Sequence, residues 1–167
     1  MNSPTGVVLS WAVRPSFRQY VADLPDGREE WSGVTLSSGG AVEFPADPGA
    51  PIAPAAGRTS VTYAFTGAIS WWGHGGALRV QVRDPHLHLV GEGRSTLSVR
   101  QAGNGADGRP VIAAFVEHHV DAGILHVPLP RLTWDGVSLF GDVYEVGAPL
   151  APLQVALGHQ EVSTCGP

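Results

Sequence analysis

The chain has almost no sulfur, no lysine and no long apolar run. Of its 167 residues one is a cysteine, Cys165, and all 10 basic residues are arginines. A single cysteine excludes an intramolecular disulfide and a cysteine-based zinc site, and its position in a Ser/Thr/Gly/Pro tail argues against thiol chemistry. No window approaches the roughly 18 apolar residues of a membrane span, so we expect no membrane segment.

Positive charge is scarce as well. The 10 basic residues are outnumbered by 15 acidic ones, and the arginines form no cluster along the chain. We therefore expect neither nucleic acid nor an anionic membrane surface as a partner. The first residues lack the positive segment and apolar segment of an export signal. On the sequence as it stands we expect a cytoplasmic protein, or a secreted one if an export signal precedes it.

Glycine and proline are abundant, with 22 and 14 residues, and leave little room for long helices. The runs between them alternate apolar and polar residues as strands do. These runs are TSVTYAFTGAISWW (59–72), ALRVQVRD (77–84), HLHLV (86–90), TLSVR (96–100), VIAAFVEH (111–118), GILHVPL (123–129) and VSLFGDVYEV (137–146). Their spacing predicts a mainly β fold, an antiparallel β-sandwich of two sheets, and the length fits a single domain over 1–167.

One segment favours a helix, within a fold that we expect to contain one or two short helices. In RPSFRQYVAD (14–23), Pro15 suits the first helical position, and Pro25 helps to stop the run. On such a helix Ser16 and Tyr20 lie one turn apart on the same face. Taken alone, Tyr20 would be an ordinary tyrosine of an amphipathic helix.

Seven histidines raise the question of a metal site. His86 and His88 project from the same face of a predicted strand, and His118 and His119 follow the end of another. Neutral imidazoles at such spacing can share a zinc ion, but a structural zinc site needs four protein ligands. We favour the simpler interpretation, in which the leucines that alternate with His86 and His88 are buried and both histidines face outward.

The chain contains no nucleophile elbow, phosphate-binding glycine loop or HExxH motif. Its five tryptophans allow a sugar-binding surface, although large aromatic side chains more often pack in a core. The adjacent Trp71 and Trp72 point to opposite faces of a strand, so at most one of them is buried on a one-sided sheet. In WWGHGGAL (71–78), the glycines around His74 remove side-chain bulk, which lets a flat ligand or another backbone approach.

Three segments resemble, in order and spacing, the signature segments of the HtaA domain, the haem-binding module of bacterial haem-uptake systems. They are LSWAVRPSFRQYV (9–21), GAISWWGHGGALRVQVRDPHL (67–87) and YEVGAPLAPLQVAL (144–157). The middle segment is the most specific, because GHGGAL followed by a strand and Asp-Pro is a long and unusual string. The resemblance spans nearly the whole chain, and it implies a protein that binds ferric haem b and is not an enzyme.

The resemblance also implies roles for individual residues. Tyr20 matches the tyrosine that is the axial ligand of ferric haem iron, and His74 matches the histidine that hydrogen-bonds the ligand oxygen. Ser16 matches a serine that lies near a haem propionate. A free tyrosine has a pKa of about 10, so the positive charge of Fe(III) and an imidazole N–H would both favour the phenolate that coordinates iron.

A third family tyrosine matches Tyr144, and adjacency in the sequence adds Phe17, Trp72 and Val143 as expected pocket walls. The last segment departs from the family, since an aspartate that is common there is replaced by Ala151. Family members are also usually exported, often in tandem copies with an anchor, and this sequence shows neither feature.

Two alternatives stay open. A haem-dependent peroxidase- or catalase-like enzyme would need an acid–base residue, such as His118 or His119, over an open face of the iron. A carbohydrate-binding β-sandwich module would show an exposed aromatic row and no dependence on Tyr20 or His74. The first prediction is a monomeric or homodimeric protein that holds one ferric haem b for transfer, uptake or buffering, with another haem-transfer protein as a candidate partner.

Overall fold

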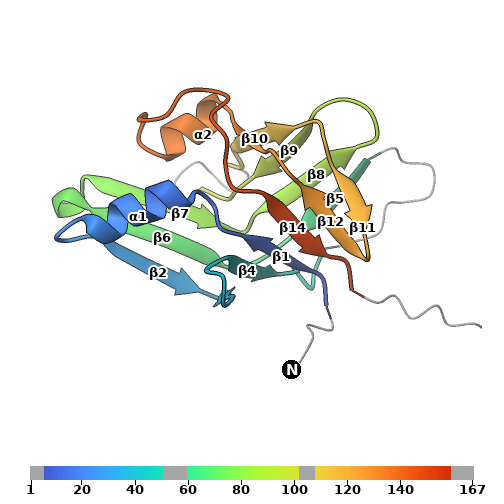
Figure 1. Cartoon of the computed structure of the whole chain (residues 1–167), viewed down its shortest axis with the longest axis horizontal. Helices are drawn as coiled ribbons and strands as arrows, with labels where there is room; N and C mark the ends of the chain where they lie inside the picture. Colours follow the sequence, from blue (N-terminus) through green and yellow to red (C-terminus); the bar gives the residue numbers. More distant parts are fainter. Residues whose placement is uncertain (1–5, 51–59, 102–107, 159–167) are drawn as a thin grey trace, which may run out of the picture.

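The computed structural model describes residues 6–50, 60–101 and 108–158. Antiparallel strands and two short α-helices make up this part of the chain (Figure 1). The mainly β prediction is confirmed, but the strands form three hydrogen-bonded sheets where two were expected. Cys165 and His159 lie outside the described residues.

The sheets differ in size, and every pairing within them is antiparallel. The largest sheet runs in the order β11 (His119–Asp121), β12 (Ile124–Val127), β14 (Leu153–Ala156), β1 (Val8–Trp11), β4 (Val42–Pro45) and β3 (Thr35–Leu36). The second runs β13 (Arg131–Leu132), β10 (Val111–Phe115), β9 (Ser95–Ser98), β8 (His86–Val90) and β5 (Ser60–Ala64). The third contains β2 (Arg28–Ser32), β6 (Ala68–Gly73) and β7 (Leu78–Arg83).

The alternating run over 59–72 is not one strand, because it divides into β5 and β6, which belong to different sheets. The chain turns at Gly67, whose φ is +109°, a value that side chains rarely adopt. A Cβ at Gly67 would also lie 2.5 Å from a methyl carbon of Val34. Both facts require glycine at the turn. The alternation of apolar and polar residues continues through Gly67, so the sequence pattern does not reveal the change of sheet.

Helix α1 (Pro15–Asp23) forms where the sequence predicts it, with Pro15 in its first turn. It buries Phe17 and Val21, which lie one turn apart on the same face. The ring of Phe17 packs edge-on against Trp71 of β6 at a centroid distance of 5.3 Å. Figure 1 shows α1 lying along the β2-β6-β7 sheet, so the helix covers one face of that sheet with its apolar side.

Helix α2 (Trp134–Leu139) replaces part of the strand that was predicted over 137–146, and that prediction is wrong. Thr133 caps the helix by accepting a hydrogen bond from the Gly136 N–H at 3.1 Å. A Cβ at Gly136 would lie 2.0 Å from the Ile112 carbonyl oxygen, so the helix packs directly on the backbone of β10. Left-handed residues Gly141 and Asp142 then turn the chain, which ends any regular run.

The predicted alternation of β8 is confirmed. Leu87 and Leu89 are buried, whereas His86 and His88 are half-buried on the other face of the strand. In the described part of the chain, no three His, Cys, Asp or Glu side chains are grouped closely enough to hold a metal ion. Neither described α-helix has the length and apolar character needed to cross a membrane.

Candidate functional site

Tyr20 and His74, which are 54 positions apart in the sequence, meet at the surface. The Tyr20 Oη atom lies 2.5 Å from His74 Nε2, and the two rings are tilted by 44°. Either group can donate this hydrogen bond: the hydroxyl to a neutral imidazole nitrogen, or an Nε2–H to the phenol oxygen. The Tyr20 side chain is 47% exposed although it belongs to a helix that packs on the core. A tyrosine oxygen with an imidazole partner is thus accessible from outside.

The loop that carries His74 has an unusual backbone. His74, Gly75 and Gly76 form a single 3-10 turn, η1 (His74–Gly76), and all three have positive φ, at 52°, 65° and 94°. A Cβ at either glycine would meet nothing within 4 Å, so the glycines are required for conformation and not for space. Their absent side chains leave the surface beside His74 bare, which suits the approach of a flat ligand.

Asp26 holds this loop from the segment that follows α1. One carboxylate oxygen accepts a hydrogen bond from the His74 N–H at 3.1 Å, and the other accepts one from the Gly75 N–H at 2.6 Å. The Gly75 N–H, and after it the His74 N–H, keep the pKa of Asp26 below its ordinary value, against the opposing effect of burial. Asp26 was not predicted from the sequence, where its only local signal is an acidic residue between Pro25 and Gly27.

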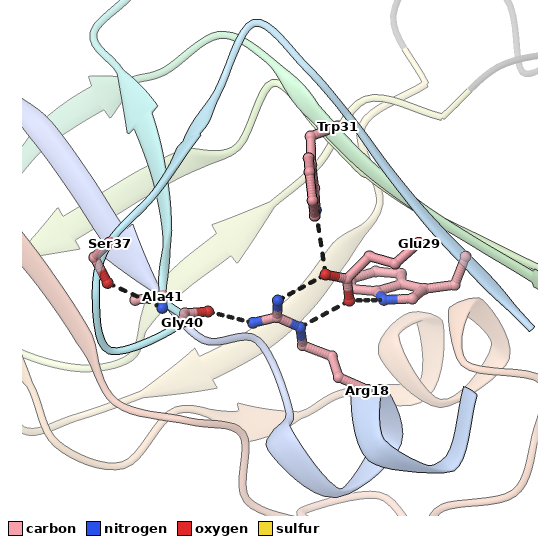
Figure 2. A network of polar contacts seen from close by, with 7 residues as sticks. Arg18, Glu29, Trp31, Ser37, Gly40 and Ala41 are labelled. Atoms are coloured by element: carbon pink, nitrogen blue, oxygen red, sulfur yellow. Dashed lines mark hydrogen bonds and ion pairs between the residues drawn. The ribbon is translucent and has the colours of Figure 1, made fainter. Parts of the chain in front are cut away.

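A polar network fixes α1 to the sheet beneath it (Figure 2). Arg18 donates from Nε to Glu29 Oε2 at 2.8 Å and from Nη2 to Glu29 Oε1 at 2.7 Å, while its Nη1 donates to the Gly40 carbonyl oxygen at 2.5 Å. The indoles of Trp71 and Trp31 donate to the same Glu29 carboxylate. Residues two positions apart on a helix point to nearly opposite sides. Because Arg18 points toward the sheet, Tyr20 faces outward.

The charge of Glu29 is stabilised by these donors. Burial by itself would raise the pKa of this carboxyl, but the hydrogen bonds from Arg18, Trp71 and Trp31, with the positive charge of Arg18, bring it below the ordinary value. A half-buried carboxylate that stays ionised keeps both Arg18 and Trp71 in place. Neither Arg18 nor Glu29 was identified from the sequence, because their pairing depends on how α1 sits against β2.

Ser16 and Tyr144, both predicted to belong to the site, lie near the beginning of α1. Ser16 is exposed, one turn before Tyr20 on the helix. Tyr144 is half-buried, and its ring lies 6.2 Å from that of Phe140 and 4.0 Å below the guanidinium carbon of Arg14. Because Arg14 directly precedes α1, these contacts attach the loop of Tyr144 to the helix that carries Tyr20.

The three residues that were expected to line the pocket lie in different places. Val143 is 71% exposed in the same loop as Tyr144. Phe17 instead lies in the core, 1% exposed, because its side of α1 faces Trp71. Trp72 is half-buried on the opposite face of β6 from Trp71, and therefore points away from α1. The two side chains face opposite ways and only Trp71 is buried, which agrees with the prediction that at most one of them is.

The histidines considered for other roles lie elsewhere. His119 of β11 stacks on its cross-strand neighbour His126 of β12, with ring centroids 5.0 Å apart. Figure 1 shows β11, the strand of His119, and α1, the helix of Tyr20, at opposite ends of the molecule. The exposed tryptophans are divided between β2, which carries Trp31, and α2, which carries Trp134. Among the described residues, β11 thus places no acid–base histidine beside Tyr20, as the enzymatic alternative would need. The exposed Trp31 and Trp134 likewise do not share a strand, as an aromatic row for sugar binding would.

Comparisons with known proteins agree with this architecture. The family model described as Htaa matches residues 6–156. The C-terminal domain of HtaA from Corynebacterium glutamicum is 24% identical, over 89% of this chain and 93% of that chain, with a TM-score of 0.71. The N-terminal domain of HtaA from the same organism is 18% identical, over 95% of this chain and 100% of that chain, with a TM-score of 0.68.

A third similar structure is the haem binding protein HtaB from Corynebacterium glutamicum. It is 19% identical, over 89% of this chain and 90% of that chain, with a TM-score of 0.60. At such identities these structures establish a shared fold and nothing more. No curated protein matches the chain.

Proposed function

The chain belongs to the HtaA family, and from this premise we propose that it binds one ferric haem b through the Tyr20 phenolate and holds it for transfer, uptake or buffering, without enzymatic turnover. The observation that carries the proposal is the 2.5 Å contact between Tyr20 Oη and His74 Nε2 at an exposed surface. The similar structure of HtaB, which is described as haem binding, supports the same ligand class.

The chemistry of the pair suits ferric iron. A phenol with a pKa of about 10 gives up its proton readily only near a strong positive charge, which Fe(III) supplies. His74 would then donate from Nε2–H to the phenolate oxygen, which stabilises the anion and fixes its direction. An anionic oxygen donor favours ferric over ferrous iron and so lowers the reduction potential.

The surroundings fit a flat, amphipathic ligand. The bare backbone of Gly75 and Gly76 leaves room beside His74, and Val143, which is exposed, would add an apolar contact to the ligand. Ser16 would donate its hydroxyl proton to a propionate from one turn before the ligand. Tyr144, held by Arg14 and Phe140, would border the same ligand.

The test is a hemin titration of haem-free protein, followed by absorption spectroscopy, with three variants beside the wild type. Tyr20→Phe keeps the ring and removes the oxygen, so the charge-transfer bands of a ferric tyrosinate should disappear. His74→Ala should retain the bands and weaken binding by about 10- to 100-fold, as expected for loss of a partner that orients a ligand. Tyr63→Phe, at a half-buried tyrosine of β5, is the matched control and should behave as the wild type.

Three results would contradict the proposal. The first is binding that survives both Tyr20→Phe and His74→Ala unchanged, which would mean that another residue holds the haem. The second is the absence of any saturable spectral change, which would bring the carbohydrate-binding alternative forward. The third is turnover of hydrogen peroxide well above that of free hemin, which would favour the enzymatic alternative.

A further inference from the structure

We propose that Asp26 is the positioning residue of the Tyr20–His74 site. Its carboxylate holds the loop of residues 73–76 in the one conformation that aims His74 Nε2 at the Tyr20 oxygen. The consequences for haem rest on the proposed function, whereas the consequences for the loop can be measured in haem-free protein.

The Asp26 carboxylate meets the backbone at the start of the loop. Its two oxygens accept hydrogen bonds from two successive backbone N–H groups, those of His74 and Gly75, at 3.1 and 2.6 Å. Both donors lie at the start of η1, where a short turn has no carbonyl of its own to satisfy them. Hydrogen bonds to a charged acceptor are stronger than those between neutral groups, so Asp26 is a strong constraint on the loop.

His74 has an unfavourable backbone conformation. Its φ of 52° lies in the left-handed region, which a residue with a Cβ adopts at an energetic cost. A side chain that binds the His74 and Gly75 N–H groups in this conformation offsets that cost. Two of the three residues of the turn are glycines, which adopt many backbone conformations, so the Asp26 carboxylate adds a constraint that their own side chains cannot supply.

Asp26 follows closely on the helix that carries Tyr20. Asp26 stands six positions after Tyr20, in a turn closed by a hydrogen bond from the Gly27 N–H to the Leu24 carbonyl oxygen at 3.1 Å. Leu24 packs so closely on the end of β6 that a Cβ at Gly73 would lie 2.6 Å from its methyl carbon. The segment at the end of α1 therefore holds the loop at two points, through Leu24 and through Asp26. The same segment thus sets the distance between Tyr20 Oη and His74 Nε2.

Arg28 and Arg79 line a hollow beside the loop together with Asp26. Neither arginine forms an ion pair with Asp26 in the described part of the chain, where the carboxylate accepts hydrogen bonds from the backbone of the loop. Removing this carboxylate takes away the constraint and leaves both Tyr20 and the imidazole of His74 in the protein.

The experiment uses Asp26→Ala and Asp26→Asn, with Asp47→Asn as the matched control. Asp47 also accepts a backbone hydrogen bond within a loop, from the Gly49 N–H at 2.9 Å, and it lies outside the site. In haem-free protein, hydrogen exchange of the His74 and Gly75 amides should accelerate about tenfold or more in Asp26→Ala, the scale of losing a hydrogen bond to a charged acceptor. Asp26→Asn, which keeps one acceptor oxygen, should show a smaller effect, and Asp47→Asn none at these two amides.

The second readout is the rate at which ferric haem leaves for an excess of apomyoglobin. Asp26→Ala should speed this loss, and the double variant Asp26→Ala/His74→Ala should lose haem no faster than His74→Ala alone, because Asp26 acts through His74. Additive effects in the double variant would overturn the proposal, as would unchanged exchange of the two amides in a folded Asp26→Ala protein. If no variant or wild type binds haem, the exchange result still decides the role of Asp26, and the proposed function fails separately.

Discussion

Arg18 of α1 and Glu29 of β2 form a two-pronged ion pair, with nitrogen-to-oxygen distances of 2.8 and 2.7 Å and side chains that are 17% and 21% exposed. The pair lies on the side of α1 away from Tyr20. It fixes the helix to the sheet through groups that are themselves held, since the Trp71 indole donates to the same carboxylate at 2.6 Å. The helix that carries the exposed Tyr20 is thus attached to the sheet by a half-buried charge pair on its opposite side.

Removing one partner of this pair should destabilise the protein. Arg18→Ala leaves the Glu29 carboxylate half-buried with the two indoles as its remaining donors, so we expect the free energy of unfolding to fall by about 2 to 3 kcal/mol. Urea denaturation followed by tryptophan fluorescence measures it. Arg131→Ala, at an exposed arginine that donates to the Gly147 carbonyl oxygen, is the control and should cost far less. Equal losses in the two variants would contradict a special role for the pair.

Acid should weaken the same interaction. In the folded protein the pKa of Glu29 lies below its ordinary value of 4.5. As the pH falls, Glu29 is therefore protonated in the unfolded chain before it is protonated in the folded protein. The stabilisation is therefore complete above the unfolded value and is lost as the pH falls through the folded value. We expect the stability difference between wild type and Glu29→Gln to be constant above pH 6 and to shrink below about pH 4.5. Denaturation curves at several pH values check this, and a difference that grows on acidification would contradict it.

Local pattern allowed much of the fold to be predicted. Alternation identified β7 and β8, and Pro15 with the stop at Pro25 located α1 to within a residue. The division into three sheets could not be predicted, because it depends on which strands meet across long stretches of chain and on a turn at Gly67 that alternation conceals. Helix α2 was missed for a different reason: its cap, Thr133, lies outside the alternating run, and Gly136 is required by a contact with β10.

The site residues divide in the same way into those that a short sequence motif identifies and those whose roles depend on tertiary contacts. A resemblance carried by short motifs selected Tyr20 and His74, and the structure places them in contact. Asp26 and Glu29 could not be found in that way, because an acidic residue in a turn or on an edge strand is common and its partners depend on how the elements pack together. Burial of Phe17 could not be foreseen from its adjacency to Ser16, since neighbouring helix positions point in different directions.

The contact at Gly136 can be tested by adding one methyl group. Gly136→Ala would place a Cβ 2.0 Å from the Ile112 carbonyl oxygen, so α2 must move away from β10 or lose its capped turn. We expect a fall in stability of about 3 kcal/mol and a lower melting temperature. Gly39→Ala, at an exposed loop position with its nearest neighbour 3.9 Å from the Cβ, is the control and should change stability little. A melting temperature equal to wild type in Gly136→Ala would mean that α2 is not held as the structure shows.

Reduction should release haem if Tyr20 is its ligand. Ferrous iron carries one positive charge less, so it stabilises a phenolate less well, and the Tyr20 oxygen should recover its proton and dissociate. Transfer of haem to apomyoglobin should therefore be faster by about tenfold or more in the presence of dithionite than in its absence. This ratio corresponds to an activation free energy that is lower by about 1.4 kcal/mol or more. In Tyr20→Phe the ratio between the two conditions should fall toward one, because the redox-sensitive bond is missing. A wild-type rate that does not depend on reduction would exclude redox-triggered release and leave direct handover to a partner as the route for ferric haem.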